Sequence, residues 1–528
     1  MRFIILSLFF TALFALLSFN LYRVQIDKGF YYFEKAQAFN DVLKELALRR
    51  GQIFFTDKYG KDIPVAMQKD YPAIYAAPSE ISDPLKVVNN LALIINIKES
   101  DLLGMINDPE SKFRLLVDKA PRDMVDKVKD ADIVGIYTRQ KQYRFYPFES
   151  LGSHMLGYVG LNKDSAKPVG LYGLEKMDNK SLSNGDEIKL TIDRNLQAES
   201  EQALDKLIKE FNAIGGTIII QEPSTGKILT LANKPDFNPN NYSNYAVKNF
   251  LNPSTQYVYE PGSVFKPITM AAGIDTGTIT PETTYIDTGK VTLNGMTIRN
   301  WDLKARGTIT MTNVIEQSVN TGAIFAEQKM GDKTFLEYLK RFGLGKNTGI
   351  DLPDEVSGSL KNLEKNQTYA IDFATASFGQ GVSVTPIQMI TAFSAIANGG
   401  LLMKPFVTRD TKPIVVRRVI KEETSREVIG MMESAVEKAR IAAIPNYRIA
   451  GKTGTAFIPE NGKYSREDLI QTFVGFLPAS NPKVVVLIKL EKPNVELAGY
   501  TVVPAFHDLA SFIINYYNIP PDKPINQQ

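Results

Sequence analysis

The sequence predicts an α+β protein in which an apolar segment and a mixed α/β domain precede a larger α+β domain. Three observations support this. Residues 1–23 are almost free of charge, residues 24–188 mix strand-like and helix-like patterns, and residues 189–520 combine helical patterns with runs of β-branched residues. A chain of 528 residues is also too long for one ordinary domain. Residues 521–528 are expected to form a loose tail.

Composition excludes several classes of protein. Hydrophobic residues make up 44% of the chain and charged residues 23%, which is the balance of a globular protein. The net charge is only +3, so we expect no nucleic-acid partner. The absence of cysteine excludes disulfides, thiolate nucleophiles and cysteine-bound metals. With only His154 and His507, and no H-E-x-x-H motif, an enzyme of this sequence is not expected to use histidine as its base.

The first segment has the length of a membrane span. Residues 3–22 carry no charge, and as a helix they would extend ~30 Å, the thickness of a bilayer core. A cleaved signal peptide would have a shorter apolar region and a small-x-small cleavage site, which we do not find. The sequence therefore predicts an uncleaved transmembrane anchor over residues 1–23. Positive charges on its two sides are nearly balanced, so they do not fix its orientation.

The domain at residues 24–188 is predicted from short alternating patterns. Residues 47–67 read as strands broken by a Tyr-Gly turn, and residues 84–97 and 120–133 have helical spacing. Residues 144–160 are dense in glycine and aromatic side chains. No compact group of chemically reactive residues stands out, so this domain is predicted to be non-catalytic.

The larger domain begins with a strand, a helix and a hairpin. Asp193 ends the strand and is placed to cap the helix that follows. Residues 215–233 are two β-branched runs around Pro-Ser-Thr-Gly, which is a hairpin pattern. Residues 385–398 form a helical pattern that Gly399-Gly400 ends. Residues 471–491 hold two strands expected to be neighbours, and a final helix is expected from about Ala505.

One Ser-x-x-Lys pattern stands apart from the two others. Ser224/Lys227 and Ser480/Lys483 lie in turn-forming sequences, where an amine stays a solvated cation. Ser263 instead begins an apolar helical run, and Lys266 lies on the same face of that helix. A lysine shielded from water there has a lowered pKa and can act as a base for the serine. Taken alone, the pair is also compatible with a capping serine beside a surface lysine.

Two further motifs favour the catalytic interpretation. Ser318 and Asn320 form a Ser-x-Asn motif, and Lys452-Thr453-Gly454 is the one Lys-Thr-Gly of the chain. S-x-x-K, S-x-N and K-T-G in this order are typical of serine enzymes that react with penicillin. The sequence therefore resembles the class B penicillin-binding proteins, which are D,D-transpeptidases of bacterial cell-wall synthesis.

The resemblance extends over most of the chain. Residues 49–60, "RRGQIFFTDKYG", resemble a structural block of the family's non-catalytic domain, with two extra residues before Asp57 and Lys58-Tyr59 in place of Arg-Asn. Residues 154–160 and 173–179 resemble its linker blocks, and residues 342–355 and 377–389 resemble segments of its catalytic domain. The implied catalytic fold is an antiparallel sheet with helices on both faces and a helical subdomain, preceded by an elongated pedestal or dimerisation domain.

The resemblance also implies residue roles. The implied catalytic residues are Ser263, Lys266, Ser318 and Lys452. The implied substrate-binding residues are Asn320, Thr453, Gly454 and Thr455. In this scheme Lys266 deprotonates Ser263, and Ser318 passes a proton to the departing D-alanine. The serine then carries the acyl group of a stem peptide until a second stem peptide attacks, and neither a metal nor a cofactor is needed.

The substrate-binding roles follow from the same resemblance. Asn320 would hold a backbone group of the substrate, and Lys452 and Thr453 would face its terminal carboxylate. Gly454 would leave the strand edge bare, so that the substrate backbone can approach. The N–H groups of Ser263 and Thr455 would form the oxyanion hole.

The resemblance further implies partners and a location. Peptidoglycan stem peptides, on a lipid-linked precursor or on nascent glycan, would be substrates, and β-lactams would be covalent inhibitors. A polytopic membrane glycosyltransferase and other division proteins would be partners. The chain would sit in the inner membrane with its amino terminus in the cytoplasm and the bulk outside it. A division role is favoured over an elongation role.

Three other functions remain as alternatives. A penicillin sensor or scaffold without turnover would keep the three motifs but would normally have several spans. A β-lactamase needs a deacylating base that we cannot place, and it would lack the domain at residues 24–188. A bifunctional enzyme would carry a glycosyltransferase motif before that domain, which the sequence lacks.

Overall fold

The structure is a computed structural model that describes residues 2–23, 50–161, 168–460 and 463–524. Helix α1 (Arg2–Tyr22) covers the segment predicted to be an anchor. Within the described part of the chain, no helix is both long and apolar enough to cross a membrane. The side chains of residues 2–9, 12 and 20 lie outside that part, so the anchor stays a prediction.

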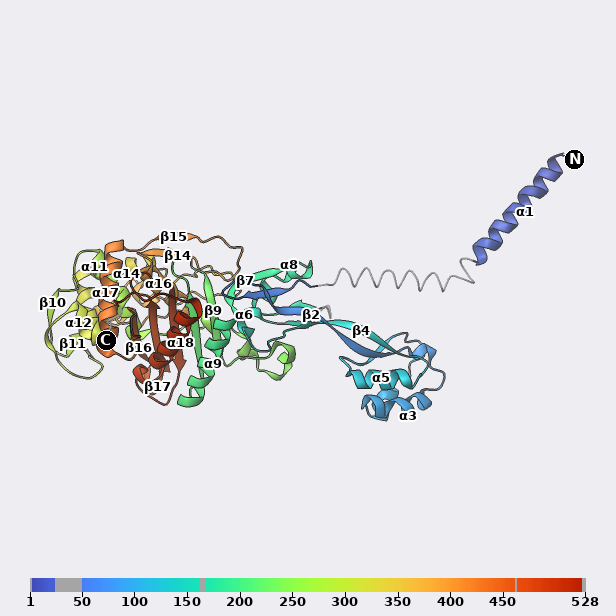
Figure 1. The fold of residues 1–528 in the computed structure, drawn as a ribbon, viewed down its shortest axis with the longest axis horizontal. Helices are drawn as coiled ribbons and strands as arrows, with labels where there is room; N and C mark the ends of the chain where they lie inside the picture. The colour runs from blue at the N-terminus through green and yellow to red at the C-terminus, as the bar shows by residue number, and fades with distance from the viewer. Residues whose placement is uncertain (1, 24–49, 162–167, 461–462, 525–528) are drawn as a thin grey trace.

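A five-stranded antiparallel sheet forms the centre of the larger domain (Figure 1). Its strand order is β16-β17-β18-β8-β9, which leaves β16 at an edge. The strands are β16 (Ala450–Glu460), β17 (Lys463–Leu477), β18 (Val484–Glu491), β8 (Gly215–Gln221) and β9 (Ile228–Lys234). Both the predicted hairpin and the predicted neighbouring pair of strands are therefore confirmed.

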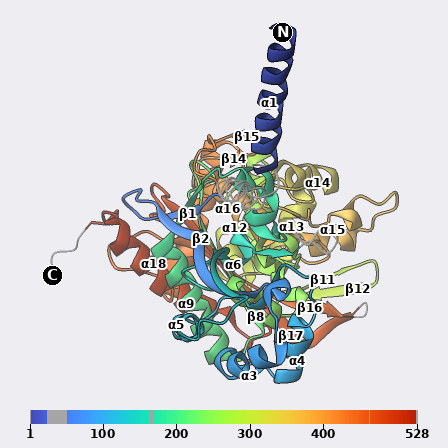
Figure 2. The same cartoon turned by 90° about the vertical axis from the view of Figure 1, so that its right-hand side faces the viewer.

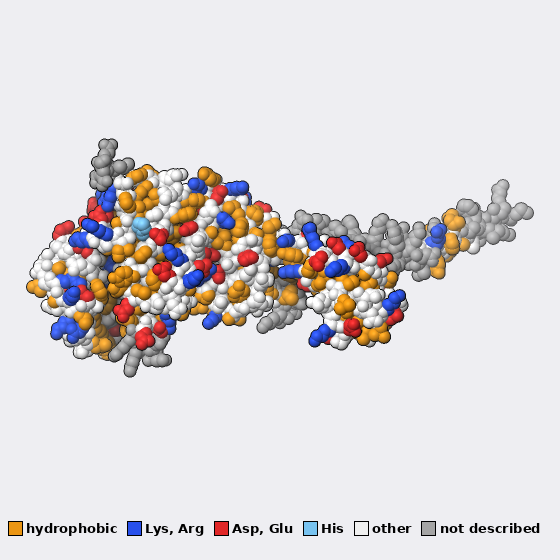
Figure 3. Space-filling view, turned by 60° about the horizontal axis from the view of Figure 1, so that its bottom comes forward, with side chains coloured by type: hydrophobic (Ala, Val, Ile, Leu, Met, Phe, Trp, Pro, Cys, Tyr) orange, Lys and Arg blue, Asp and Glu red, His pale blue; other side chains and the backbone are white. Residues whose placement is uncertain are grey.

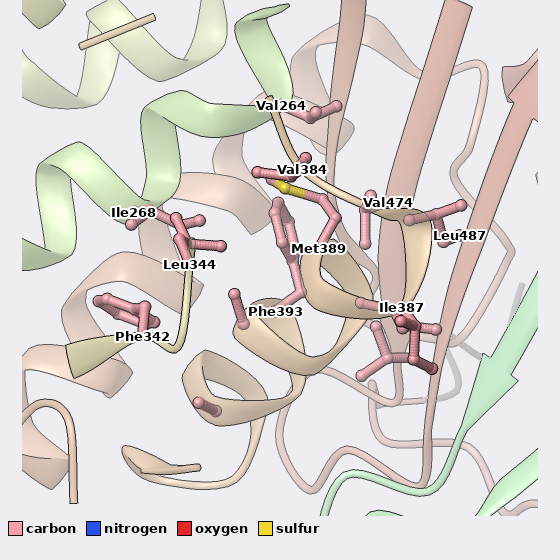
Figure 4. Close-up of a cluster of buried hydrophobic side chains, with 14 of the residues drawn as sticks. Val264, Ile268, Phe342, Leu344, Val384, Ile387, Met389, Phe393, Val474 and Leu487 are labelled. Carbon is pink, nitrogen blue, oxygen red and sulfur yellow. The ribbon is translucent and has the colours of Figure 1, made fainter. Parts of the chain in front are cut away.

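Helices cover both faces of this sheet because alternate side chains of each strand point to opposite sides. On one face, Phe473 and Ile488 pack against α9 (Arg194–Phe211) and α18 (Val502–Tyr517). On the other face, Val474 and Leu487 pack against α16 (Pro386–Ala397), as Figure 4 shows.

Helix α11 (Lys266–Asp275) lies on α16, and this contact fixes its start relative to the sheet. Val264 and Ile268 meet Val384, Met389 and Phe393 in the same buried cluster (Figure 4). Asp193 caps α9 through its carboxylate, as the sequence predicted.

The rest of the domain is mainly helical and lies on the opposite side of the sheet from α9 and α18 (Figure 2). Its helices are α12 (Met311–Glu316), α13 (Asn320–Met330), α14 (Asp332–Arg341), α15 (Ala370–Ala376) and α17 (Glu422–Ala439). Its short strands are β10 (Thr284–Asp287), β11 (Lys290–Leu293), β12 (Met296–Arg299) and β13 (Gly307–Thr310).

The amino-terminal domain is built on a second, mixed sheet. Its strands are β1 (Ile53–Thr56), β2 (Ile63–Ala76), β3 (Arg114–Val117), β4 (Ile136–Phe145) and β7 (Ile188–Asp193), and β1 pairs with β7 in parallel. The strand predicted to begin the larger domain is β7, and it pairs within this second sheet. Helices α3 (Pro84–Ile95), α4 (Glu99–Ile106) and α5 (Arg122–Asp130) form a small separate core at the far end of the β2–β4 ribbon (Figure 1). Basic and acidic side chains are interspersed over the face shown in Figure 3.

One buried carboxylate joins three segments of the amino-terminal domain. Glu175 is fully buried and accepts hydrogen bonds from Arg50 Nε at 2.6 Å and Arg144 Nε at 2.6 Å. Arg50 lies in the first block that resembles the family, and Glu175 lies in its last linker block. Removing one partner of a buried ion pair is strongly destabilising because it leaves an uncompensated buried charge. The first block and the last linker block therefore meet for a structural reason.

Two predictions at the carboxyl end need correction. Helix α18 begins at Val502, not near Ala505, because Pro504 is tolerated within a first turn. The described part of the tail is not loose. Asp522 accepts hydrogen bonds from Arg448 N at 2.7 Å and from Ser480 Oγ at 2.5 Å, and Lys523 pairs with Glu437.

Candidate active site

Ser263 lies in a turn that leads directly into α11. A 3₁₀ turn (Gly262–Phe265) precedes the helix, so Ser263 comes just before α11 and does not open it. Gly262 has φ +61°, and a Cβ there would lie 2.9 Å from the carbonyl oxygen of Thr455. Its N–H donates to Gly379 O at 3.0 Å. Glycine is therefore required for both the turn and the close approach of β16.

The amine of Lys266 is completely buried and is surrounded by oxygen atoms. Its Nζ lies 2.7 Å from the carbonyl oxygen of Ser318 and 2.8 Å from Oδ1 of Asn320. It also lies 3.0 Å from Ser263 Oγ and 3.2 Å from Ser318 Oγ. The structure thus brings together four of the residues that the sequence singled out.

The donors and acceptors around this nitrogen determine where its lone pair points. A neutral amine has two N–H donors, and two of its neighbours, Ser318 O and Asn320 Oδ1, can only accept. The orientation of the Asn320 amide is set by its Nδ2, which donates to Arg299 O at 3.0 Å. Both N–H groups of Lys266 are therefore used, and the lone pair is left for a hydroxyl. Ser263 Oγ is the nearer of the two hydroxyls.

Electrostatics favour this neutral form. Burial lowers the pKa of Lys266 well below that of an ordinary lysine, and the positive charges of Lys452 and Arg306 lower it further. A buried ammonium is costly to desolvate, so the group releases its proton. Burial therefore favours the neutral amine, which can accept a proton from Ser263.

Ser318 links the two lysines of the site. It lies in the turn between α12 and α13 with φ +54°, a backbone conformation that is uncommon for residues other than glycine, asparagine or aspartate. Its Oγ lies 3.0 Å from Lys452 Nζ and 3.2 Å from Lys266 Nζ. A hydroxyl in this position can pass a proton from one side of the site to the other.

Lys452 extends from the edge strand β16 into the same site. It is buried, and its Nζ also lies 2.9 Å from Thr453 O and 3.4 Å from Thr453 Oγ1. Burial lowers the pKa of Lys452 to about 7. Along the strand, Thr453 is half-buried and Thr455 is exposed, whereas Lys452, Gly454 and Ala456 between and beside them are buried. This is the alternation expected of a strand with one open face.

Gly454 has a different neighbour from the one expected. A Cβ at this position would lie 2.9 Å from Pro261 O and 3.0 Å from Val264 N, in the turn that carries Ser263. The absent side chain therefore lets β16 lie against the Ser263 turn. That the bare strand edge also admits the substrate backbone stays a prediction.

Substitution of Gly454 by alanine is expected to slow acylation by penicillin about 100-fold. The methyl group would force β16 away from the Ser263 turn, and a displacement near 1 Å at a reacting centre has roughly that cost. Stopped-flow acylation with a fluorescent penicillin measures the effect. Gly430→Ala is the matched control because nothing lies within 4 Å of a Cβ there. Equal rates in the two variants would show that the contact does not matter.

The other Ser-x-x-Lys copies lie in turns, as predicted. Ser224 is in the turn between β8 and β9, where Lys227 lies 3.6 Å from Glu222. Ser480 is in the turn between β17 and β18 and donates to Asp522. Lys227 is half-buried and Lys483 is exposed, so neither amine is shielded from water.

Sequence reasoning missed two charged residues at this site. The Arg306 guanidinium donates to Gln317 Oε1 at 2.7 Å and to Asp302 Oδ2 at 2.8 Å, beside the Ser318 turn. Glu260 accepts from Gly381 N at 3.1 Å and from Tyr464 O–H at 3.0 Å. No motif marks Arg306, whereas the position of Glu260 directly before Pro-Gly-Ser263 was an available signal.

Comparison with known proteins gives the family. Residues 216–510 match the penicillin-binding protein transpeptidase domain, and residues 46–231 match the penicillin-binding protein dimerisation domain. Stage V sporulation protein D of Bacillus subtilis is 30% identical over 523 residues, covering 90% of this chain and 79% of that protein. Peptidoglycan D,D-transpeptidase FtsI of Escherichia coli K12 is 30% identical over 518 residues, covering 91% of this chain and 86% of that protein.

The fold agrees with a solved relative. Penicillin-binding protein 2X from Streptococcus thermophilus superposes with a TM-score of 0.74 at 23% identity, covering 89% of this chain and 80% of that one. The transpeptidase match alone spans more than half of the chain, and the pair formed by Ser263 and Lys266 lies within it. The chain therefore belongs to the class B penicillin-binding proteins, with a transpeptidase domain that follows a dimerisation domain.

Proposed function

We propose that this chain is a peptidoglycan D,D-transpeptidase that cross-links stem peptides through an acyl-enzyme on Ser263. The observation that carries the proposal is the buried amine of Lys266, whose lone pair is left for the Ser263 hydroxyl. An amine with this environment is an unprotonated base placed within hydrogen-bond distance of a nucleophile. Family membership supports the reaction class.

In the acylation step, Ser263 Oγ attacks the carbonyl carbon between the last two D-alanines of a donor stem peptide. Its proton moves to Lys266 Nζ, which lies 3.0 Å away. The C–N bond then breaks, and the amine of the leaving D-alanine takes a proton through the Ser318 hydroxyl. Ser318 can serve because it contacts both Lys266 and Lys452.

The remaining residues hold the substrate. The Lys452 ammonium and the Thr453 hydroxyl bind the terminal carboxylate, and the Asn320 amide holds a backbone group of the donor. The N–H groups of Ser263 and Thr455 stabilise the oxyanion, and losing one such donor typically costs ~3 kcal/mol. An amine of a second stem peptide then attacks the ester and releases Ser263. A β-lactam follows only the first step and leaves the serine acylated.

An exchange assay tests this function. The full chain is incubated with a pentapeptide ending in D-Ala-D-Ala and a fluorescent D-amino acid, which serves as the acceptor amine. Incorporation of the D-amino acid, abolished by penicillin, supports a transpeptidase. Penicillin acylation without incorporation or peptide cleavage would favour the sensor or scaffold alternative. Rapid penicillin hydrolysis would favour a β-lactamase.

The rate of acylation is expected to fall above pH 7. Burial lowers the pKa of Lys452 to about 7, so the free enzyme loses the cation that faces the substrate carboxylate as pH rises through that value. The second-order rate constant reports the free enzyme and should drop by about tenfold per pH unit there. At saturating penicillin the bound carboxylate raises the pKa of Lys452, so the decline should move to higher pH. A flat profile between pH 6 and 9 would contradict this role of Lys452.

We further propose a role in cell division and a membrane location. The likeness to peptidoglycan D,D-transpeptidase FtsI supports the division role. The charge-free residues 3–22 support a membrane anchor. Cross-linking takes place outside the cytoplasmic membrane, so the amino terminus would be cytoplasmic and residues from 24 onward would lie outside. We place the contact with a polytopic glycosyltransferase on residues 3–22 and the domain at 24–188. Complementation of a strain depleted of its division transpeptidase tests this role, and rescue of elongation alone would contradict it.

A further inference from the structure

A buried carboxylate lies where two small sheets meet the first turn of α13. Asp287 is the last residue of β10, and it is buried. Its oxygens accept hydrogen bonds from the residue before β11, the residue after β12, the residue before β13 and the second residue of α13. These donors are Gly289 N (2.8 Å), Asn300 Nδ2 (3.1 Å to Oδ1 and 3.0 Å to Oδ2), Arg306 N (3.0 Å) and Thr321 Oγ1 (2.7 Å).

One arm of this network fixes the residue that follows the Ser-x-Asn motif. Thr321 is buried, and because its hydroxyl donates to Asp287, its oxygen can accept from the Tyr285 hydroxyl at 3.0 Å. The Thr321 N–H donates to Asn300 Oδ1 at 3.2 Å. Tyr285 in turn stacks on Phe325, with ring centroids 5.1 Å apart. Thr321 is therefore held through both its backbone and its side chain.

A second arm fixes the residue that precedes the motif. Arg306 donates its backbone N–H to Asp287, and its Nε donates to Gln317 Oε1 at 2.7 Å. The guanidinium is itself held by Asp302, to which Nη2 donates at 2.8 Å and Nη1 at 3.3 Å. Gln317 directly precedes Ser318. The carboxylate of Asp287 is thus connected to both flanks of the Ser-x-Asn turn.

The backbone of this turn needs such support. Ser318 has φ +54°, and a residue other than glycine keeps this conformation only where its surroundings enforce it. The same conformation places Ser318 Oγ 3.0 Å from Lys452 Nζ and 3.2 Å from Lys266 Nζ. Relaxation of the turn would change both distances, so the proton path through the Ser318 hydroxyl depends on what holds the turn.

We propose that Asp287 is a positioning residue that holds Ser318 and Asn320 in place by clamping both flanks of their turn. The inference rests on the proposed function, in which Ser318 passes a proton and Asn320 holds the donor. Asp287 acts through Thr321 and Arg306, since its own oxygens are occupied by the donors of the network. Asparagine cannot replace it, because in either orientation its amide NH₂ would face hydrogen-bond donors.

Acylation kinetics of the full chain with a fluorescent penicillin test this inference. Asp287→Asn is expected to lower the rate at saturating penicillin about 100-fold, the rough cost of a 1 Å displacement at a reacting centre. The half-saturating concentration should change less, because Lys452 and Thr453 still face the penicillin carboxylate. A variant that is merely less stable would instead show a smaller labelled fraction with an unchanged rate constant.

Variants of Thr321 test one arm by itself. Thr321→Val keeps the shape of the side chain and loses the hydroxyl, so it is expected to lower the saturating rate about tenfold. Thr321→Ser keeps the hydroxyl and should retain most of the rate. In an Asp287→Asn background, Thr321→Val should cause little further loss, because the contact that it removes is already broken. These milder variants decide the question if Asp287→Asn does not fold.

Asp275 provides a matched control in the same domain. It is a buried carboxylate at the far end of α11, and it accepts from three donors. These are Tyr338 Oη (2.6 Å), Lys421 N (2.6 Å) and Thr424 Oγ1 (2.9 Å). Asp275→Asn should therefore lower stability in chemical denaturation as Asp287→Asn does, while the acylation rate stays near that of the wild type.

Three results would overturn the inference. One is an unchanged saturating rate in folded Asp287→Asn or Thr321→Val. Another is an equal loss of rate in Asp275→Asn, which would mean that general loosening of the domain slows acylation. The third is the absence of any covalent adduct in the wild type, in which case the proposed function fails and this inference fails with it.

Discussion

Replacement of Ser263 by alanine is expected to abolish covalent labelling by a fluorescent penicillin. The substitution removes the oxygen that would form the ester and leaves the buried amine of Lys266 without a nucleophile to activate. Ser263 is only half-buried, so losing one hydroxyl should change the free energy of unfolding by about 1 kcal/mol or less. Gel fluorescence and the intact mass of the protein measure the loss, and thermal unfolding confirms that the variant is folded.

The chain offers internal controls for this result. Ser224 and Ser480 stand in the same Ser-x-x-Lys pattern but lie in turns, so their alanine variants should label like the wild type. Ser318→Ala should label more slowly, by about 10²–10⁴-fold, because it loses a proton path and keeps the nucleophile. Undiminished labelling of Ser263→Ala would instead identify Ser318 as the first candidate nucleophile.

Local chemistry explains why much of the fold could be predicted from the sequence. The hairpin at residues 215–233 follows from two β-branched runs around a turn, and Asp193 caps α9 because its carboxylate reaches N–H groups two and three residues on. These features depend on residues that are close in sequence. The order of the three motifs likewise predicted the candidate site without any knowledge of its geometry.

What the sequence did not predict depends on contacts between distant segments. Gly454 has its neighbour nearly two hundred residues earlier, in the Ser263 turn, and only the packing of β16 brings the two together. Asp522 was assigned to a loose tail because its partners, Arg448 and Ser480, lie far away in sequence. Arg306 also reaches the site through its hydrogen bond to Gln317, to which no sequence pattern connects it. Such contacts are set by the tertiary fold and leave no local signature.

The second large effect is expected at Lys266. Methionine has a similar length and no charge, so Lys266→Met should be accommodated in a pocket that is already dry. It removes the base, and acylation by penicillin is expected to fall by about 10³–10⁴-fold. It also leaves Ser318 O and Asn320 Oδ1 without a donor, which should cost about 1–3 kcal/mol of stability. Acylation kinetics and chemical denaturation, measured on the same preparation, separate these two effects.

An arginine at the same position distinguishes proton transfer from hydrogen bonding. Lys266→Arg supplies donors to the same oxygens, but a guanidinium stays protonated and cannot take the Ser263 proton. If the amine acts as a base, Lys266→Arg should be as slow as Lys266→Met. Lys227→Met and Lys483→Met, which alter the lysines of the two turn copies, should leave acylation unchanged. Recovery of most of the rate in Lys266→Arg would mean that the amine only positions Ser318 and Asn320, and the base would have to be sought elsewhere.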